Sequence, residues 1–128
     1  MSYVIKNLRD VEDMAPRFGF DHVQEARFPR EDLGAERTGL AYLVVKPGQR
    51  QAFAHRHANA EEIYVVVRGT GRVKLDDEIA EVREMDAIRV APQVARAFEA
   101  GDAGLELLAF GPHHDRDAEM VGDDFWAD

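Results

Sequence analysis

Short apolar runs, each four to six residues long, recur along the chain from Gly39 onward and are separated by turn-forming residues. Several runs alternate apolar and polar side chains, which is the period of a half-buried β-strand. Gly48, Gly69 and Gly71 lie where we expect the chain to reverse, because glycine tolerates the positive φ angles of tight turns. Seven or eight strands at a spacing of roughly 8–12 residues predict a sandwich or barrel. The expected strands cover residues 40–45, 51–57, 62–67, 72–75, 79–83, 87–90, 95–99 and 105–110.

The two ends of the chain lack this regular pattern. Residues 1–38 show no sustained periodicity and predict a poorly defined N-terminal arm that packs on the barrel. Residues 113–128 are rich in charged side chains and predict a polar C-terminal tail. Residues 39–112 therefore form the expected barrel of an all-β, single-domain protein.

Composition narrows the classes of function. A chain of 128 residues, 45 % of them hydrophobic, fits one globular domain with a real core. The formal net charge of −9 argues against nucleic acid or an anionic membrane as partner, since both need a cationic surface. The absence of cysteine excludes disulfides, a thiol nucleophile and thiolate metal ligands. Because the N-terminus lacks an apolar signal core and no run approaches ~20 apolar residues, we expect a cytoplasmic protein.

Candidate chemistry is concentrated in one segment, where His55 and His57 stand one residue apart and Glu62 follows. Side chains alternate between faces in an extended chain, so the two imidazoles should project to the same side. Two imidazoles and a nearby carboxylate on one face are a ligand set suited to first-row transition metals. The segment therefore predicts a metal site.

The same segment resembles the first motif of the cupin superfamily. That motif has a leading glycine, a His-x-His pair, a glutamate and a closing glycine, which correspond here to Gly48, His55, His57, Glu62 and Gly69. The six residues between the glutamate and the closing glycine select Glu62 over its neighbour as the carboxylate in register. Six residues also separate Gly48 from His55, one more than is usual. The resemblance covers about residues 39–112.

The second cupin motif departs from the family pattern. Met85-Asp86 stands in place of the usual glycine-aspartate, Ala91-Pro92-Gln93 in place of the proline-glycine turn, and Phe98 in place of the closing aromatic residue. Arg96 occupies the position where the family has a histidine. Arginine offers no lone pair and stays protonated, so it cannot be the fourth metal ligand. At ~5 Å and an effective dielectric constant of ~20, its repulsion of a divalent ion is about 6 kcal/mol.

The resemblance implies a jelly-roll barrel with its pocket on the inner face, and a homodimer by family habit. It also implies Fe, Mn, Ni or Zn on His55, His57 and Glu62, with an anionic small molecule held by Arg96. Two alternatives stay open. In one, the metal is absent and a charge-assisted pair between Arg96 and Glu62 takes its place, which would make the protein a non-catalytic sensor or carrier. In the other alternative, the cupin motif is aligned with the wrong residues of this sequence. Binding and transforming a ligand both fit, so enzymatic activity is left undecided.

The two-residue period of a strand predicts which side chains line the pocket. If His55 and His57 point inward, Phe53 should as well; Tyr64 and Val66 should accompany Glu62, and Phe98 should accompany Arg96. The expected ligand-binding residues are accordingly Arg96, Tyr64, Phe53, Phe98 and Tyr42.

Two further features lie near the C-terminus. His113-His114-Asp115 has the residue types of a metal site, but its polar surroundings favour a solvated loop. Phe125-Trp126 is an aromatic pair that should pack somewhere, and we expect it to cover a barrel mouth or dock on a partner subunit.

Overall fold

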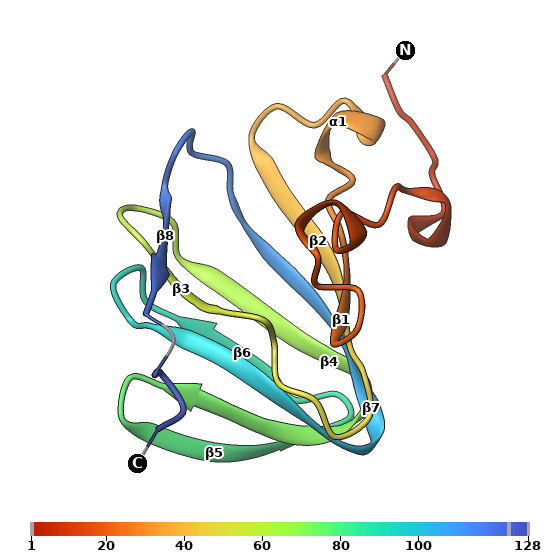
Figure 1. The fold of residues 1–128 in the computed structure, drawn as a ribbon. Helices are drawn as coiled ribbons and strands as arrows, with labels where there is room; N and C mark the ends of the chain where they lie inside the picture. The colour runs from red at the N-terminus through yellow and green to blue at the C-terminus, as the bar shows by residue number, and fades with distance from the viewer. Residues whose placement is uncertain (1, 123, 128) are drawn as a thin grey trace.

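The computed structural model describes residues 2–122 and 124–127, which form eight antiparallel strands curled into a half-barrel (Figure 1). The all-β fold class predicted from the sequence is confirmed. The strands are β1 (Gln24–Arg27), β2 (Thr38–Val45), β3 (Ala54–His57), β4 (Glu62–Leu75), β5 (Glu78–Arg83), β6 (Ala87–Val90), β7 (Arg96–Pro112) and β8 (Ala118–Val121), and the short helical turns are η1 (Leu8–Asp10), η2 (Pro16–Phe18) and α1 (Arg30–Leu33).

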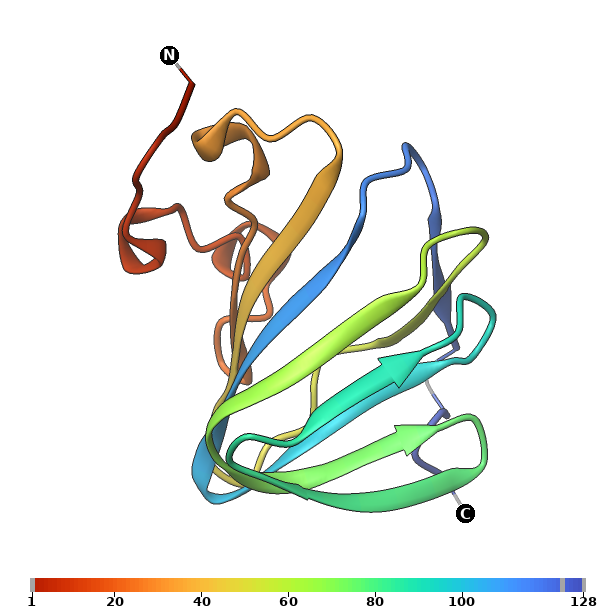
Figure 2. The same ribbon diagram turned by 180° about the vertical axis from the view of Figure 1, so that it is seen from behind.

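Two long strands, β4 and β7, run through both walls of the half-barrel (Figure 2). Their first stretch of pairing, 63–69 with 105–110, belongs to the wall that also contains β1, β2 and β6. Their second stretch, 71–75 with 96–100, belongs to the wall that contains β5, β3 and β8. The interior between the walls is therefore lined by alternate residues of the same two strands.

The glycines of β4 stand at corners and not at chain reversals, which corrects the sequence expectation. The pairing of β4 with β7 shifts register between Val66 and Arg68 and again between Gly69 and Gly71. A Cβ on Gly69 would lie 2.1 Å from the carbonyl oxygen of Gly104, and Gly69 has a φ of +89°. Side chains are thus excluded where the strand bends between walls, and the runs expected as separate strands form one.

The core fills the space between the walls. Val66, Phe98 and Leu107 have no exposed surface, and Tyr64 is 1 % exposed with its ring 5.0 Å from that of Phe98. Buried positions alternate along β4 at Tyr64 and Val66 and along the end of β7 at Leu105, Leu107 and Ala109, as a barrel interior requires. Other buried members of the cluster are Val45, Val73, Val82, Val90 and Ala100.

Both ends of the chain add to the sheet. In the N-terminal arm, β1 pairs with β2 along the barrel edge. In the C-terminal tail, for which the sequence predicts no strand, β8 pairs with β3 over residues 118–121. After β8, Trp126 lies beneath Arg50 of the same chain, whose guanidinium carbon is 4.7 Å from the ring centre, so the aromatic pair packs on its own barrel. In residues 2–122 and 124–127, no helix has the length and apolar character needed to cross a membrane.

Candidate metal centre

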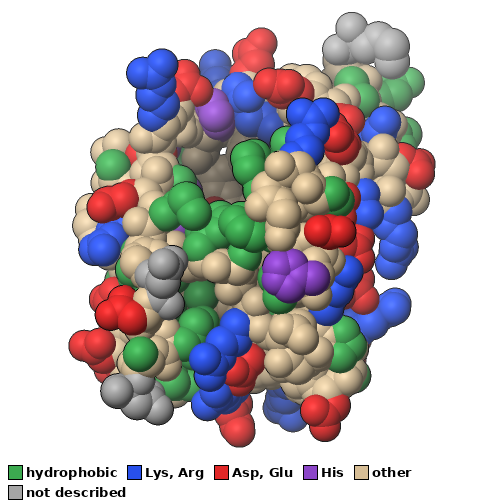
Figure 3. Space-filling model, in the orientation of Figure 1, with side chains coloured by type: hydrophobic (Ala, Val, Ile, Leu, Met, Phe, Trp, Pro, Cys, Tyr) green, Lys and Arg blue, Asp and Glu red, His purple; other side chains and the backbone are tan. Residues whose placement is uncertain are grey.

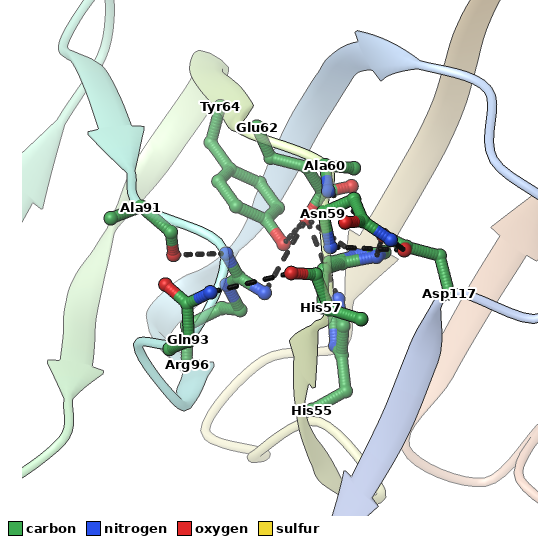
Figure 4. Close-up of polar contacts among 11 residues, drawn as sticks. His55, His57, Asn59, Ala60, Glu62, Tyr64, Ala91, Gln93, Arg96 and Asp117 are labelled. Atoms are coloured by element: carbon green, nitrogen blue, oxygen red, sulfur yellow. Dashed lines mark hydrogen bonds and ion pairs between the residues drawn. The ribbon is translucent and has the colours of Figure 1, made fainter.

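His55 and His57 face the interior because of the way β3 is paired. His55 lies opposite Arg96 of β7, and His57 lies opposite Ala118 of β8. The two histidines are separated by one residue on the strand, so their rings share a face, with centroids 5.0 Å apart (Figure 4). The shared face predicted from the strand period is confirmed, and that face is turned to the interior.

Glu62 reaches the same point from the start of β4. Its Oε1 atom lies 3.4 Å from Nε2 of His55 and 3.4 Å from Nε2 of His57. Two ligands on one ion with bonds of ~2.1 Å are about 3.0 to 3.4 Å apart for octahedral to tetrahedral angles. In the described part of the chain, these three residues are the one group of metal-ligating type whose ligand atoms all lie within 4.8 Å of one another.

Hydrogen bonds hold the Glu62 carboxylate in its charged form. The Tyr64 hydroxyl donates to Oε1 of Glu62 at 2.6 Å. Burial acts to raise the pKa of Glu62, but the two nearby imidazoles and the Tyr64 hydrogen bond outweigh it and hold that pKa well below its usual range. Burial, together with the charge of Glu62, raises the pKa of Tyr64, so the phenol stays a donor. A deprotonated carboxylate is the form that ligates a metal.

Asp117 fixes the orientation of His57. Its Oδ2 atom lies 3.1 Å from Nδ1 of His57 and also accepts a hydrogen bond from the backbone of Ala60 at 2.8 Å, while Oδ1 accepts two hydrogen bonds from Asn59. A carboxylate on Nδ1 selects the tautomer with the proton there, which leaves a lone pair on Nε2. Nε2 of His57 is buried and has no hydrogen-bond partner among the described residues. The donor set therefore fits a metal ion.

Arg96 is the largest fully buried side chain, with 1 % of its surface exposed. Its Nη2 donates to the carbonyl oxygen of Ala91 at 3.2 Å, and its Nη1 lies 4.0 Å from Oε1 of Glu62. That distance is within the range of an ion pair but too long for a hydrogen bond, so Arg96 and Glu62 form no charge-assisted hydrogen bond in the structure. Nε and Nη1 have no hydrogen-bond partner among the described residues. A buried guanidinium with two unmet donors needs an acceptor at this point.

An apolar cavity of about 260 Å³ opens beside the three candidate ligands, and Figure 3 shows the hollow between the walls bordered by hydrophobic side chains. Phe53 and Tyr64 line it, as the strand period predicts, whereas Arg96 and Phe98 are buried and do not line it. The other lining residues are Gln24, Ala26, Phe28, Ala41, Leu43, Gln51, His55, His57, Glu62, Ala109, Ala118 and Met120.

Tyr42 is not brought to this cavity. Its neighbours Ala41 and Leu43 point into the cavity, so alternation along β2 directs Tyr42 to the opposite face. There its hydroxyl donates to the Glu106 carboxylate, and burial together with this contact raises the pKa of Tyr42. His113, in the C-terminal loop, contacts Asp115 at 2.8 Å and does not join the three candidate ligands.

Sequence reasoning missed Asp117. It lies in the segment predicted to be a polar C-terminal tail, and 60 positions separate it from His57 in the sequence. One local signal was available, because Ala118-Glu119-Met120-Val121 begins directly after Asp117 and can be read as a short edge strand.

A comparison with protein families agrees with this fold. The cupin domain family matches residues 41–111, more than half of the chain. The chain is a cupin. An uncharacterized protein of Methanocaldococcus jannaschii is 29 % identical over 102 residues, which cover 77 % of the chain and 80 % of that protein.

Solved structures share the fold of this cupin. A polyketide cyclase from Streptomyces resistomycificus has a TM-score of 0.75 at 20 % identity, covering 96 % of this chain and 89 % of that one. A variant of oxalate decarboxylase from B. subtilis has a TM-score of 0.72 at 20 % identity, covering 92 % of this chain and 33 % of the decarboxylase. Identities this low support the fold alone.

Proposed function

We propose that this cupin holds one divalent first-row metal ion on His55, His57 and Glu62 and binds a small anionic molecule beside it. Fe, Mn, Ni and Zn are the candidate ions, since the ligands are imidazole nitrogen and carboxylate oxygen. The observation that carries the proposal is the convergence of three ligand atoms at one wall of an apolar cavity. The unpartnered Nε2 of His57, held in place through Asp117, supports it.

The charges around the centre favour an anion when the metal is bound. Glu62 and Asp117 are carboxylates whose pKa values are lowered, in both cases by hydrogen bonds that outweigh the effect of burial, and Arg96 is a fixed cation. With neutral imidazoles these three side chains carry a net charge of −1, and a divalent ion changes it to +1. A monoanion would then neutralise the site, whereas the metal-free site would repel it.

Each side chain has a distinct part in this scheme. The ion would supply a Lewis-acid centre with open positions for an oxygen donor. Arg96 does not line the cavity, so its guanidinium would act on that oxygen through its positive charge, or through a water that accepts a hydrogen bond from Nη1. Tyr64 holds the Glu62 carboxylate by its 2.6 Å hydrogen bond, and Phe53 contributes to the apolar wall that accepts the ligand's carbon skeleton.

A second candidate is a metal-free binding protein in which Arg96 neutralises Glu62. The observation that favours it is that Oε1 of Glu62 already has the Tyr64 hydroxyl and two imidazole nitrogens around it. By the same count of charges, such a pocket would select neutral or cationic ligands. For assembly and location, we keep the expectation of a cytoplasmic homodimer, and light scattering tests the oligomeric state.

Metal-dependent anion binding tests the proposal. Protein stripped with a chelator and protein reloaded with Mn(II) are each mixed with butyrate, and the relaxation rates of the butyrate protons are measured. We expect the reloaded wild type to enhance relaxation strongly, because Mn(II) is paramagnetic and the carboxylate would approach it. Reloaded His57→Ala should give the enhancement of free Mn(II) at most. Equal binding of butyrate to stripped and reloaded protein would contradict the proposal.

A further inference from the structure

The candidate metal centre stands where two cavities meet. Beside the cavity of about 260 Å³, which we call the apolar lobe, lies another of about 370 Å³, which we call the polar lobe. Each is large enough for part of a small organic ligand. The lobes share five lining residues, namely Phe28, Ala41, His57, Glu62 and Ala109. A ligand bound at the metal can therefore extend into either lobe.

The two lobes differ in chemistry. Apart from the site residues, the apolar lobe is lined by side chains such as Leu43, Phe53 and Met120. The polar lobe is instead lined at the α1 side and at the C-terminal loop by titratable side chains. These are Arg30, Glu31, His113, His114 and Asp117. A ligand that fills the polar lobe must carry a polar group at the end remote from the metal.

Arg30 is the fixed cation of the polar lobe. It is the first residue of α1, which ends at Gly34, a residue with a φ of 67°. Within residues 2–122 and 124–127, its buried Nε atom has no hydrogen-bond partner, and its guanidinium forms no ion pair with a carboxylate. The Nε atom of Arg27 in the adjacent strand also lacks a partner among the described residues, but the two terminal nitrogens of Arg27 donate to Glu25 and to the backbone of Val11.

The other charged groups of the polar lobe are already engaged or face solvent. Asp117 accepts hydrogen bonds from the 59–60 backbone and contacts His57. His113 contacts Asp115, and His114 and Glu31 are exposed. Among the described residues that line the polar lobe, Arg30 is thus the cation with a buried donor that has no partner.

We infer that the ligand of this cupin is an anion with two acidic groups, one bound at the metal and the other bound by Arg30. The inference rests on the proposed function, which it extends from anionic small molecules to dicarboxylates or carboxylate-phosphates. The first acidic group neutralises the metal centre, and the second pairs with a guanidinium that is partly withdrawn from water. A charge-assisted hydrogen bond of this kind contributes about tenfold or more in affinity.

Matched pairs of carboxylates test this inference on Mn(II)-loaded protein. Succinate, glutarate and adipate are compared with butyrate, valerate and hexanoate, and each dissociation constant is taken from the proton-relaxation titration. At one chain length or more, we expect the dicarboxylate to bind the wild type about tenfold more tightly than its monocarboxylate. Arg30→Gln should reduce that ratio to about one. Arg37→Gln is the control, because Arg37 is an exposed arginine at the same end of the barrel that lines neither lobe.

The ratio is measured within each variant, so a loss of folded protein cancels. A ratio near one in the wild type at every chain length overturns the inference, as does a ratio that survives in Arg30→Gln. Metal-dependent binding of the monocarboxylates would leave the proposed function standing in both cases. Failure of the wild type to bind Mn(II), or to bind any carboxylate, overturns the proposed function and the inference with it.

Discussion

Replacing Asp117 by asparagine changes a single atom and tests how the candidate metal centre is oriented. Each oxygen of the Asp117 carboxylate serves two donors. Oδ1 accepts from the backbone and side-chain nitrogens of Asn59 at 3.0 and 2.9 Å, and Oδ2 accepts from the Ala60 backbone at 2.8 Å and faces Nδ1 of His57 at 3.1 Å. Asparagine has one oxygen and one NH₂ group, so two of these donors must face an NH₂ group in either orientation.

The consequence for the metal follows from the tautomer of His57. If the new NH₂ group faces His57, Nδ1 becomes an acceptor and the ring proton moves to Nε2, which then cannot ligate. If it faces Asn59, the 59–60 segment loses both of its hydrogen bonds to Oδ1. Changes in groups that orient a metal-bound histidine weaken metal affinity 10- to 100-fold. We therefore expect the dissociation constant for Mn(II) or Zn(II) to rise by about that factor in Asp117→Asn.

A competition titration against a chromophoric chelator measures this change directly. Asp115→Asn is the matched control, since it makes the same substitution in an exposed carboxylate whose contact is with His113. We expect its metal affinity to equal that of the wild type. A folded Asp117→Asn protein with an unchanged dissociation constant would refute the reasoning, because His57 would then need no carboxylate to hold its ring.

Three further predictions concern the wall on which the C-terminal aromatic pair packs. Gly71→Ala would place a Cβ 2.1 Å from the Glu99 carbonyl oxygen. Urea denaturation should then show a loss of at least about 2 kcal/mol in the free energy of unfolding. An unchanged free energy of unfolding would show that the corner accommodates a methyl group. The hydrogen bond from Arg50 lowers the pKa of Glu99 below its ordinary value of 4.5, helped by one from Arg72 and opposed by burial. The ionised Glu99 therefore stabilises the fold fully above about pH 4.5, and this stabilisation is lost as the pH falls through the lowered pKa of Glu99 in the folded protein. The melting temperatures of Glu99→Gln and wild type should differ at pH 7 and converge in acid. A difference that does not change with pH would contradict this. Trp126→Ala removes the ring beneath Arg50 and should cost about 1 kcal/mol by the same urea assay, whereas no loss would mean that the tail packs without consequence.

The fold and the three candidate ligands could be read from the sequence because their signals are local. Alternating apolar residues marked the strands, and one residue between His55 and His57 was enough to place both imidazoles on one face. Glu62 was selected over Glu61 by the six residues that separate it from Gly69 in the cupin motif. Each of these inferences needs a window of only a few residues.

Other features depended on contacts between distant parts of the chain. Gly69 and Gly71 carry the same local signal whether the chain reverses or bends at a corner, and the neighbouring carbonyls decide the matter. Tyr42 lies in a run that is apolar on both faces, so alternation could not tell which face meets the cavity. The contact between Asp117 and His57 depends on the pairing of β8 with β3, which local sequence does not predict.

Elemental analysis of the purified, untagged protein tests the central proposal most directly, with His57→Ala and Arg96→His analysed beside the wild type. We expect about one Fe, Mn, Ni or Zn per wild-type chain, since three protein ligands converge on one point. Chelation should then lower the melting temperature, because an ion at 100 times its dissociation constant stabilises the fold by about 2.7 kcal/mol. His57→Ala should contain no stoichiometric metal. A wild type that stays empty after incubation with all four ions, while Arg96→His loads one, would contradict the account and show that the arginine has replaced the metal.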